Sequence, residues 1–344
     1  MSDPILEADR FGTAPTPRDT HHLIGHAEAQ ASIREAWDAG RLPHALLLGG
    51  PEGVGKATLA YRVARFVLSG GAAPAHSLAV DAANPAARQV SALSHPDLLV
   101  LRRTPNDSGK LPTMIPAETV RRVRSFFGST AALGGWRVCI VDTLDEMNAQ
   151  GANALLKTLE EPPSRSLFLL VSHAPGRLLP TIRSRCRMVH LRALETAEVV
   201  AALEALSVSM PGLDRARFED AAEASGGSVQ EALALLSGDG LEVRKATSQL
   251  LDSLPSVDPK ALHALGERLQ GDRGGAFENF VGTVEAWVSD HATGRRQRPS
   301  LRLARLPEVW EKVRRAAIDA DTYNLDRKTL VFRIFATLDE AVRP

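Results

Sequence analysis

The sequence has little cysteine, no net charge and no long hydrophobic run. Its 344 residues include two cysteines, Cys139 and Cys186, which are too far apart to have the spacing of a metal-ligand motif. Lysine plus arginine equals aspartate plus glutamate at 41 each, so no overall charge attracts the chain to nucleic acid or to an anionic membrane. No stretch approaches the ~20 apolar residues that span a bilayer, and residues 1–20 lack the apolar segment of a signal peptide. These absences predict a reduced, cytoplasmic protein that binds neither metal nor membrane.

Short apolar segments alternate with helical patterns through the first half of the chain. With 44% hydrophobic and 24% charged residues, the chain is typical of a folded protein with two or three domains. The predicted strands are 44–48, 98–101, 137–142, 167–171 and 188–191, and the helices between them are 26–39, 56–68, 116–127 and 152–161. This alternation predicts an α/β fold, a mostly parallel sheet with helices on both faces.

After about residue 194 the pattern becomes helical. The predicted helical segments are 196–206, 215–224, 229–236 and much of 242–344, where 271–275 and 294–299 interrupt the pattern, while 1–20 and 70–87 are predicted to be irregular. We therefore predict an α/β base domain over 1–194, a small three-helix lid over 195–241 and an all-helical domain over 242–344.

Residues 50–58 read G-P-E-G-V-G-K-A-T, a phosphate-binding loop with one part missing. In the pattern G-x-x-x-x-G-K-[ST], backbone N–H groups surround phosphates, the lysine reaches the β/γ oxygens and the hydroxyl binds Mg²⁺. Here the hydroxyl position is Ala57, and one step along a helix rotates the next side chain by roughly 100° away. The candidate nucleotide-binding residues of this degenerate site are Gly50, Gly53, Gly55, Lys56, Thr58 and Asp142.

Asp142 ends the predicted strand 137–142. An ATP-hydrolysing P-loop protein holds Mg²⁺ with such a carboxylate, beside a residue that orients the attacking water. In the ATPase form of the motif a glutamate follows at once, but this chain has Thr143, and Asp145 and Glu146 are too far along to replace it. Asp142 could instead simply cap the next turn. The nearby phosphate loop favours the nucleotide-site interpretation.

Two further strings carry the most specific signal. Residues 152–163 read A-N-A-L-L-K-T-L-E-E-P-P, and residues 181–186 read T-I-R-S-R-C. By pattern alone the first string is a helix with Leu155, Leu156 and Leu159 on its buried side. Both strings resemble bacterial clamp-loader AAA+ subunits of DNA polymerase III. Further matches lie at 44–51 and 95–97, with a weaker one at 324–328, so that the resemblance covers nearly the whole chain. The incomplete phosphate loop makes the delta prime branch of this family the most similar.

The resemblance implies a role for Arg185. In this family the arginine of the serine-arginine-cysteine motif reaches a neighbouring subunit's γ-phosphate as an arginine finger, a catalytic role in trans. The alternative is a surface arginine in a basic stretch with Arg183 and Arg187. The resemblance also aligns Gln230 with an arginine by which ATPase members contact their own nucleotide.

Three hydrolytic parts are therefore replaced, by Ala57, Thr143 and Gln230. The resemblance implies a component of the DNA polymerase III holoenzyme without ATPase activity of its own. In this role the chain is a stator in a five-membered ring with ATPase subunits and the clamp-opening delta subunit. The ring acts on the sliding clamp and primer-template DNA. Weak ATP or ADP binding is compatible with the loop. Many relatives carry a four-cysteine zinc module, but residues 70–94 contain no cysteine. The alternatives are an active AAA+ ATPase and, less favoured, a stand-alone DNA-binding module.

Overall fold

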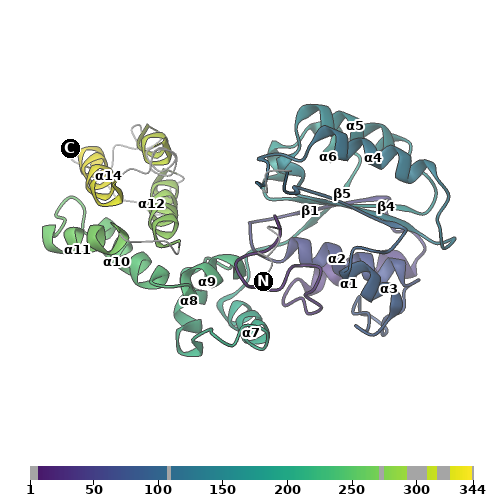
Figure 1. Cartoon of the computed structure of the whole chain (residues 1–344), viewed down its shortest axis with the longest axis horizontal. Coiled ribbons are helices and arrows are strands. Elements are labelled where there is room, and N and C mark those ends of the chain that lie inside the picture. The colour runs from purple at the N-terminus through teal and green to yellow at the C-terminus, as the bar shows by residue number, and fades with distance from the viewer. Residues whose placement is uncertain (1–6, 107–109, 271–274, 293–307, 316–325, 343–344) are drawn as a thin grey trace. The chain divides into compact units, whose positions relative to one another are not determined.

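A computed structural model describes residues 7–106, 110–270, 275–292, 308–315 and 326–342 of the chain (Figure 1). The chain divides into two compact units. Residues 1–215 and 226–230 form the first, and residues 216–225 and 231–344 form the second. Each unit has its own hydrophobic core.

The first unit is built on a five-stranded parallel sheet. Its strands are β1 (Ala45–Gly49), β2 (Leu98–Arg102), β3 (Arg137–Asp142), β4 (Ser166–Ser172) and β5 (Arg187–His190). They pair in the order β2-β3-β4-β1-β5, and every pairing is parallel. The carboxyl ends of the strands therefore share one edge, where ligand sites of such sheets lie.

Helices cover both faces of this sheet (Figure 1). One face carries α1 (Ala27–Asp38), α2 (Lys56–Leu68) and α3 (Pro85–Ser91), and the other carries α4 (Ala117–Gly128), α5 (Ala149–Glu160) and α6 (Pro180–Arg183). The unit also contains α7 (Thr196–Ser207) and the 3₁₀ helices η1 (Leu144–Glu146) and η2 (Pro175–Arg177), and the 3₁₀ helix η3 (Arg215–Arg217) lies at its boundary with the second unit. This arrangement confirms the predicted α/β class.

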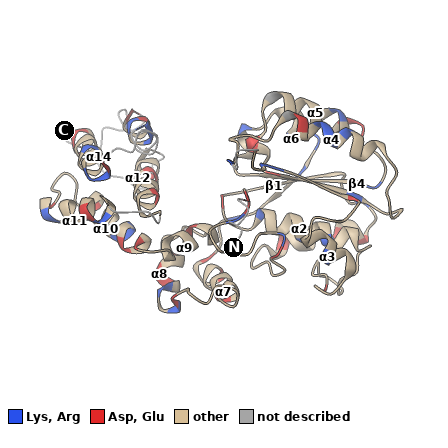
Figure 2. Ribbon diagram, viewed as in Figure 1, with Lys and Arg blue, Asp and Glu red and all other residues tan. Residues whose placement is uncertain are grey.

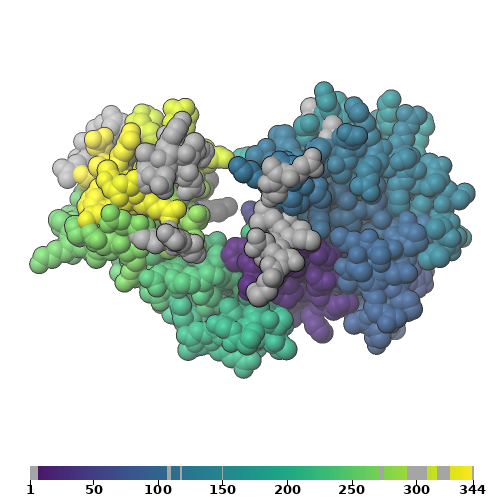
Figure 3. Space-filling model, in the orientation of Figure 1, coloured from purple at the N-terminus to yellow at the C-terminus, as the bar shows by residue number. Residues whose placement is uncertain are grey.

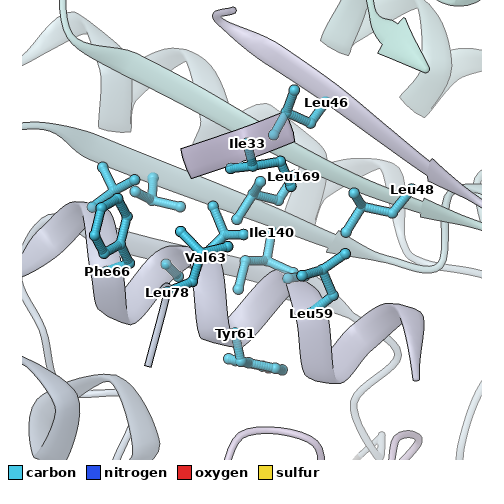
Figure 4. Close-up of a cluster of buried hydrophobic side chains, with 14 of the residues drawn as sticks. Ile33, Leu46, Leu48, Leu59, Tyr61, Val63, Phe66, Leu78, Ile140 and Leu169 are labelled. Atoms are coloured by element: carbon cyan, nitrogen blue, oxygen red, sulfur yellow. The ribbon is translucent and has the colours of Figure 1, made fainter. Parts of the chain in front are cut away.

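The strands are apolar along their whole length because both faces are buried. In β3, Val138 and Ile140 belong to the core under α2, whereas Cys139 and Val141 belong to the core under α4 and α5. Figure 4 shows the first of these cores, where side chains of β1, β3 and β4 meet those of α2. Cys139 is fully buried, and burial raises the pKa of its thiol far above the ordinary range. It is a small core residue, as predicted.

The second unit is helical. It contains α8 (Phe218–Ala224), most of α9 (Val229–Leu236), α10 (Gly240–Asp252), α11 (Pro259–Gln270), α12 (Ala276–Ala292), a helix over residues 308–315 and α14 (Arg327–Val342). One core joins α10, α11, α12, residues 308–315 and α14, with Phe277, Phe280 and Trp287 among its aromatic members. The predicted helical C-terminal region is thus confirmed in the described ranges.

The structure agrees with the predicted irregular segment at the N-terminus but not with the one predicted over 70–87. Helix α3 begins inside residues 70–87, where an irregular segment was predicted; Asn84 caps it by accepting a hydrogen bond from the Ala86 N–H at 2.9 Å. Residues 7–20 contain neither helix nor strand, as predicted, and lie on the surface of the first unit (purple, Figure 3). The predicted interruption at 294–299, residues 271–274 of the one predicted at 271–275, and residues 324–325 of the 324–328 match lie outside the described residues.

Candidate functional site

The glycine loop joins β1 to α2 at the carboxyl edge of the sheet. Gly50, Gly53 and Gly55 have φ values of 155°, 72° and 100°, which residues other than glycine rarely adopt. A Cβ on Gly50 would lie 2.1 Å from the carbonyl oxygen of Leu191, and one on Gly53 would lie 2.1 Å from Ser228 Oγ. The loop therefore needs glycine both for its backbone shape and for its close neighbours.

Lys56 is turned into its own loop. Its side chain is buried at 3% exposure, and Nζ donates hydrogen bonds to the carbonyl oxygens of Gly50, at 2.9 Å, and Pro51. Burial lowers the pKa of Lys56 to about 8. The lysine that would bind phosphate is thus already engaged by backbone oxygens.

Further contacts hold the loop from outside. The Val229 N–H donates to the Gly53 carbonyl at 3.0 Å, and the Gln230 amide donates to a Glu52 carboxylate oxygen at 3.4 Å. A ring nitrogen of His26 lies 2.8 Å from the Val54 carbonyl oxygen. The segment 226–230 therefore fastens to the loop, and Gln230 reaches it through an exposed neutral amide. Sequence patterns did not identify His26, because a lone histidine before a helix carries no specific signal.

Ala57 and Thr58 both lie in the first turn of α2, which begins at Lys56. The expected rotation between successive helical side chains therefore applies to them. The hydroxyl of Thr58 therefore does not lie at the position where the phosphate-loop pattern has a hydroxyl and this chain has Ala57.

Asp142 is the last residue of β3, paired in register with Arg102 of β2. Burial, together with the nearby carboxylates of Asp9 and Glu146, raises the pKa of Asp142 to about 7. Arg102 in turn forms ion pairs with Asp9 and with Glu7, the latter at 3.3 Å. The N-terminal segment thus brings two acidic side chains to this edge, which sequence reasoning missed because the contact joins residues about 95 positions apart.

The residues after Asp142 differ in their contacts. Thr143 is buried, and no partner for its hydroxyl is found among the described residues. Asp145 accepts hydrogen bonds from Ser172 Oγ at 3.0 Å and from the N–H groups of His173 and Ala174 at 2.7 and 3.2 Å. Its carboxylate therefore ties the turn after β3 to the end of β4.

Arg185 lies in the turn between α6 and β5, away from the glycine loop in sequence. Its Nη2 forms an ion pair with Glu160 Oε1 at 2.8 Å, and the side chain is 34% exposed. Its Nη1 donates to the Thr181 carbonyl at 2.9 Å and to Ser184 Oγ at 3.4 Å. The guanidinium is thus at the surface and oriented by groups of its own chain.

The neighbouring arginines differ from Arg185. The Arg187 guanidinium donates to Ser32 Oγ at 2.7 Å, which ties β5 to α1. Arg183 is exposed at the end of α6. Cys186 is half-buried and packs against the core under α5, and burial raises the pKa of its thiol to about 11. The three arginines of the basic stretch are therefore not equivalent.

No group of three or more His, Cys, Asp or Glu side chains suited to a metal ion occurs among the described residues. No described helix combines the length and the apolar character that crossing a membrane requires.

Comparisons with known proteins agree on one family. The family model described as DNA polymerase III, delta subunit, matches residues 25–195. The DNA polymerase III subunit delta' of Pseudomonas aeruginosa is 36% identical over 214 residues, 62% of this chain and 61% of that protein. That of Escherichia coli is 33% identical over 228 residues, 65% of this chain and 64% of that protein. The matches thus span less than two thirds of each relative.

More distant similarity extends further along the chain. The DNA polymerase III subunit tau of Escherichia coli is 28% identical over 264 residues, 74% of this chain and 39% of that protein. A solved gamma subunit-related protein of DNA polymerase III from Thermotoga maritima aligns with 93% of this chain and 100% of its own, at a TM-score of 0.45 and 18% identity. On the family model and the delta' relatives, the chain belongs to the delta prime family of DNA polymerase III clamp-loader subunits.

Proposed function

We propose that this chain is the delta prime subunit of a DNA polymerase III clamp loader, a stator without ATPase activity of its own. In this role it joins ATPase subunits and a delta subunit in a hetero-oligomeric ring in the cytoplasm. The ring loads the sliding clamp onto primed DNA for replication. The chain's direct contribution to the chemistry is Arg185, given to the nucleotide of a neighbouring ATPase subunit.

The observation that carries this proposal is the state of Lys56. Its ammonium group is buried and bonded to two carbonyl oxygens of its own loop, so it does not point freely toward a phosphate site. Binding a triphosphate would require breaking these bonds without the hydroxyl that Ala57 lacks. The pKa of Asp142, about 7, means that Mg²⁺ binding at neutral pH would have to displace a proton from part of the carboxyl population.

Arg185 has the properties that its role requires. A guanidinium is planar, always charged and able to donate two parallel hydrogen bonds to phosphate oxygens. Its position is fixed on both sides, because Ile182 is buried and Cys186 packs against the same core. The side chain itself is one-third exposed. A rigid base with a reachable guanidinium is what catalysis in trans needs.

The same proposal includes the remaining parts of the chain. Residues 1–194 would form the base domain, 195–241 the lid and 242–344 the collar that assembles the ring. Gly50, Gly53, Gly55, Lys56, Thr58 and Asp142 would form a vestigial nucleotide site able to bind ATP or ADP weakly, through backbone N–H groups and without Mg²⁺. No zinc is required.

The test is ATP turnover by a ring reconstituted with its ATPase and delta subunits, clamp and primed DNA. With Arg185→Ala the ring should assemble normally, but turnover should fall about tenfold or more, since an arginine finger contributes roughly 10³–10⁵ at its own site. Arg183→Ala, a surface arginine two residues away, is the matched control and should leave turnover unchanged. Equal turnover for the Arg185→Ala and wild-type rings would refute the finger role.

A further inference from the structure

The side chain of Arg185 folds back on its own chain instead of extending from the surface. Nη1 bonds the carbonyl oxygen of Thr181, four residues earlier, and Nη2 meets the carboxylate of Glu160 at 2.8 Å. To reach a phosphate on another subunit, the guanidinium must leave this carboxylate. The ion pair is therefore a resting arrangement that competes with the action in trans.

The fold places Glu160 for this contact. Glu160 is the last residue of α5, and Pro162 and Pro163 prevent the helix from continuing. On the buried side of the same helix, Leu155 and Leu159 share a core with Ile182 of α6. The end of α5 and the turn that holds Arg185 are thus fixed beside each other.

Helix stability does not explain the glutamate. A negative charge at a helix C-terminus is unfavourable, because the backbone carbonyls there already carry partial negative charge. The pair is also weak as a source of stability, since the side chains of Arg185 and Glu160 are 34% and 46% exposed. An exposed pair of this kind shifts a local equilibrium by roughly two- to fivefold. That is enough to bias where the guanidinium lies and too little to hold the fold.

We propose that Glu160 is a resting anion for the arginine finger, which the triphosphate of a neighbouring subunit must displace. This inference rests on the proposed role of Arg185. A triphosphate carries several negative charges against one on Glu160, so it wins the guanidinium once the subunits are correctly docked. Before docking, Glu160 keeps the finger folded back and lowers premature turnover.

The experiment measures ATP turnover of the reconstituted ring with Glu160→Gln. Glutamine keeps an oxygen acceptor but removes the charge, so turnover at subsaturating ATP should rise about two- to fivefold. Glu161→Gln removes the adjacent exposed charge and is the matched control, with no change expected. Raising the salt from 0.05 to 0.5 M should shrink the Glu160→Gln effect, because salt screens an exposed pair.

A second arm separates this inference from the proposed function. In an Arg185→Ala background, Glu160→Gln should have no effect, because its action passes through the guanidinium. If Arg185→Ala lowers turnover but Glu160→Gln leaves it unchanged or lowers it, the resting-anion role is wrong and the finger role stands. A Glu160→Gln effect that persists without Arg185 would also overturn it. If Arg185→Ala itself has no effect, the proposed function fails.

Discussion

At the scale of single residues, burial shifts the pKa values of Lys56 and Asp142 toward their neutral forms. Lys56 is buried with a pKa of about 8, and Asp142 has a pKa of about 7, with burial the largest cause of both shifts. A working site would present a charged lysine to phosphate and a charged aspartate to Mg²⁺. Here burial disfavours both charges. Lys56 bonds the carbonyl oxygens of its own loop, and Asp142 ends β3.

Asp142→Asn should stabilise the protein at pH 8. Because the folded pKa of about 7 lies above the ordinary 3.8, the stability that this carboxyl contributes is present below pH 3.8 and is lost as the pH rises through 7. At pH 8 the wild type buries a costly charge that asparagine lacks. The pKa difference between about 7 and 3.8, at ~1.4 kcal/mol per pKa unit, sets the scale of the effect. The free energy of unfolding in urea should therefore rise by on the order of 2–4 kcal/mol.

The pH series supplies the control for this prediction. Near pH 5 the wild-type carboxyl is neutral, so the difference in unfolding free energy between the two proteins should be much smaller there. A destabilising Asp142→Asn at pH 8 would mean that the charged carboxylate is favoured, as it would be at a functioning metal site.

At the scale of elements, the N-terminal segment completes the edge of the sheet. Glu7 and Asp9 pair with Arg102 at the end of β2 and with Arg18 within the segment, at 2.7 Å for the Glu7–Arg18 pair. Although burial alone would raise it, the hydrogen bond and charge of Arg18, together with Arg102, hold the pKa of Glu7 below its ordinary value. Arg65 of α2 adds hydrogen bonds to the Arg18 and Thr20 carbonyls. The segment is irregular but firmly attached.

Arg102→Gln should detach this segment. The Asp9 and Arg102 side chains are 3% and 13% exposed, and removing Arg102 leaves the buried Asp9 carboxylate paired only with Arg18, at 3.7 Å. We expect a loss of about 2–4 kcal/mol in the free energy of unfolding, with faster tryptic cleavage at Arg10 and Arg18.

Arg88→Gln, an exposed arginine on α3, is the matched control. It should change the unfolding free energy by no more than about 0.5 kcal/mol and leave cleavage unchanged. Stable attachment of the segment in Arg102→Gln would show that the ion pairs are incidental.

The arginines of α4 and Arg137 at the start of β3 have different surroundings. Arg121, Arg122 and Arg124 of α4 are exposed, and Figure 2 shows Lys and Arg positions in blue on this helix. Arg137 instead is buried, and its guanidinium donates to the carbonyl oxygens of Phe126 and Phe127 at 3.0 and 2.8 Å. It therefore caps the C-terminal end of α4, a use that no local pattern in the sequence announces.

At the scale of the whole molecule, the phosphate loop and Arg185 differ in how accessible they are to other molecules. Its phosphate loop is closed on its own lysine, while Arg185 stands at the surface of the same unit. An ATPase subunit would need both an open loop and a finger from its neighbour. The combination fits a subunit that supports the hydrolysis of others.

The isolated full-length chain should therefore show no Mg²⁺-dependent ATP hydrolysis above background. The reason is the joint absence of the hydroxyl at Ala57, of an acidic residue at Thr143 and of a cation at Gln230. The measurement is steady-state phosphate release from ATP, with Lys56→Ala as the matched variant. Hydrolysis by the wild type that Lys56→Ala abolishes would favour the alternative of an autonomous AAA+ ATPase.

Most of the fold could be predicted from the sequence because its elements carry strong local patterns. Buried parallel strands are continuous apolar runs, and α2, β3 and α9 begin and end at the predicted residues. Helix α3 was missed because Ala, Gly and Pro around it resemble a loop, and only its Asn84 cap signals a helix. The domain boundaries at 194 and 241 stay predictions.

The sequence by itself determined the α/β class, the family and which parts of the hydrolytic site are absent, since these depend on residue identity and spacing. Only the tertiary structure decided what the remaining charges contact: Lys56 its own loop, Asp142 the neighbourhood of Asp9, and Arg185 the end of α5. The physical reason is that burial and Coulomb interactions depend on distances between residues far apart in the chain, which no local pattern contains.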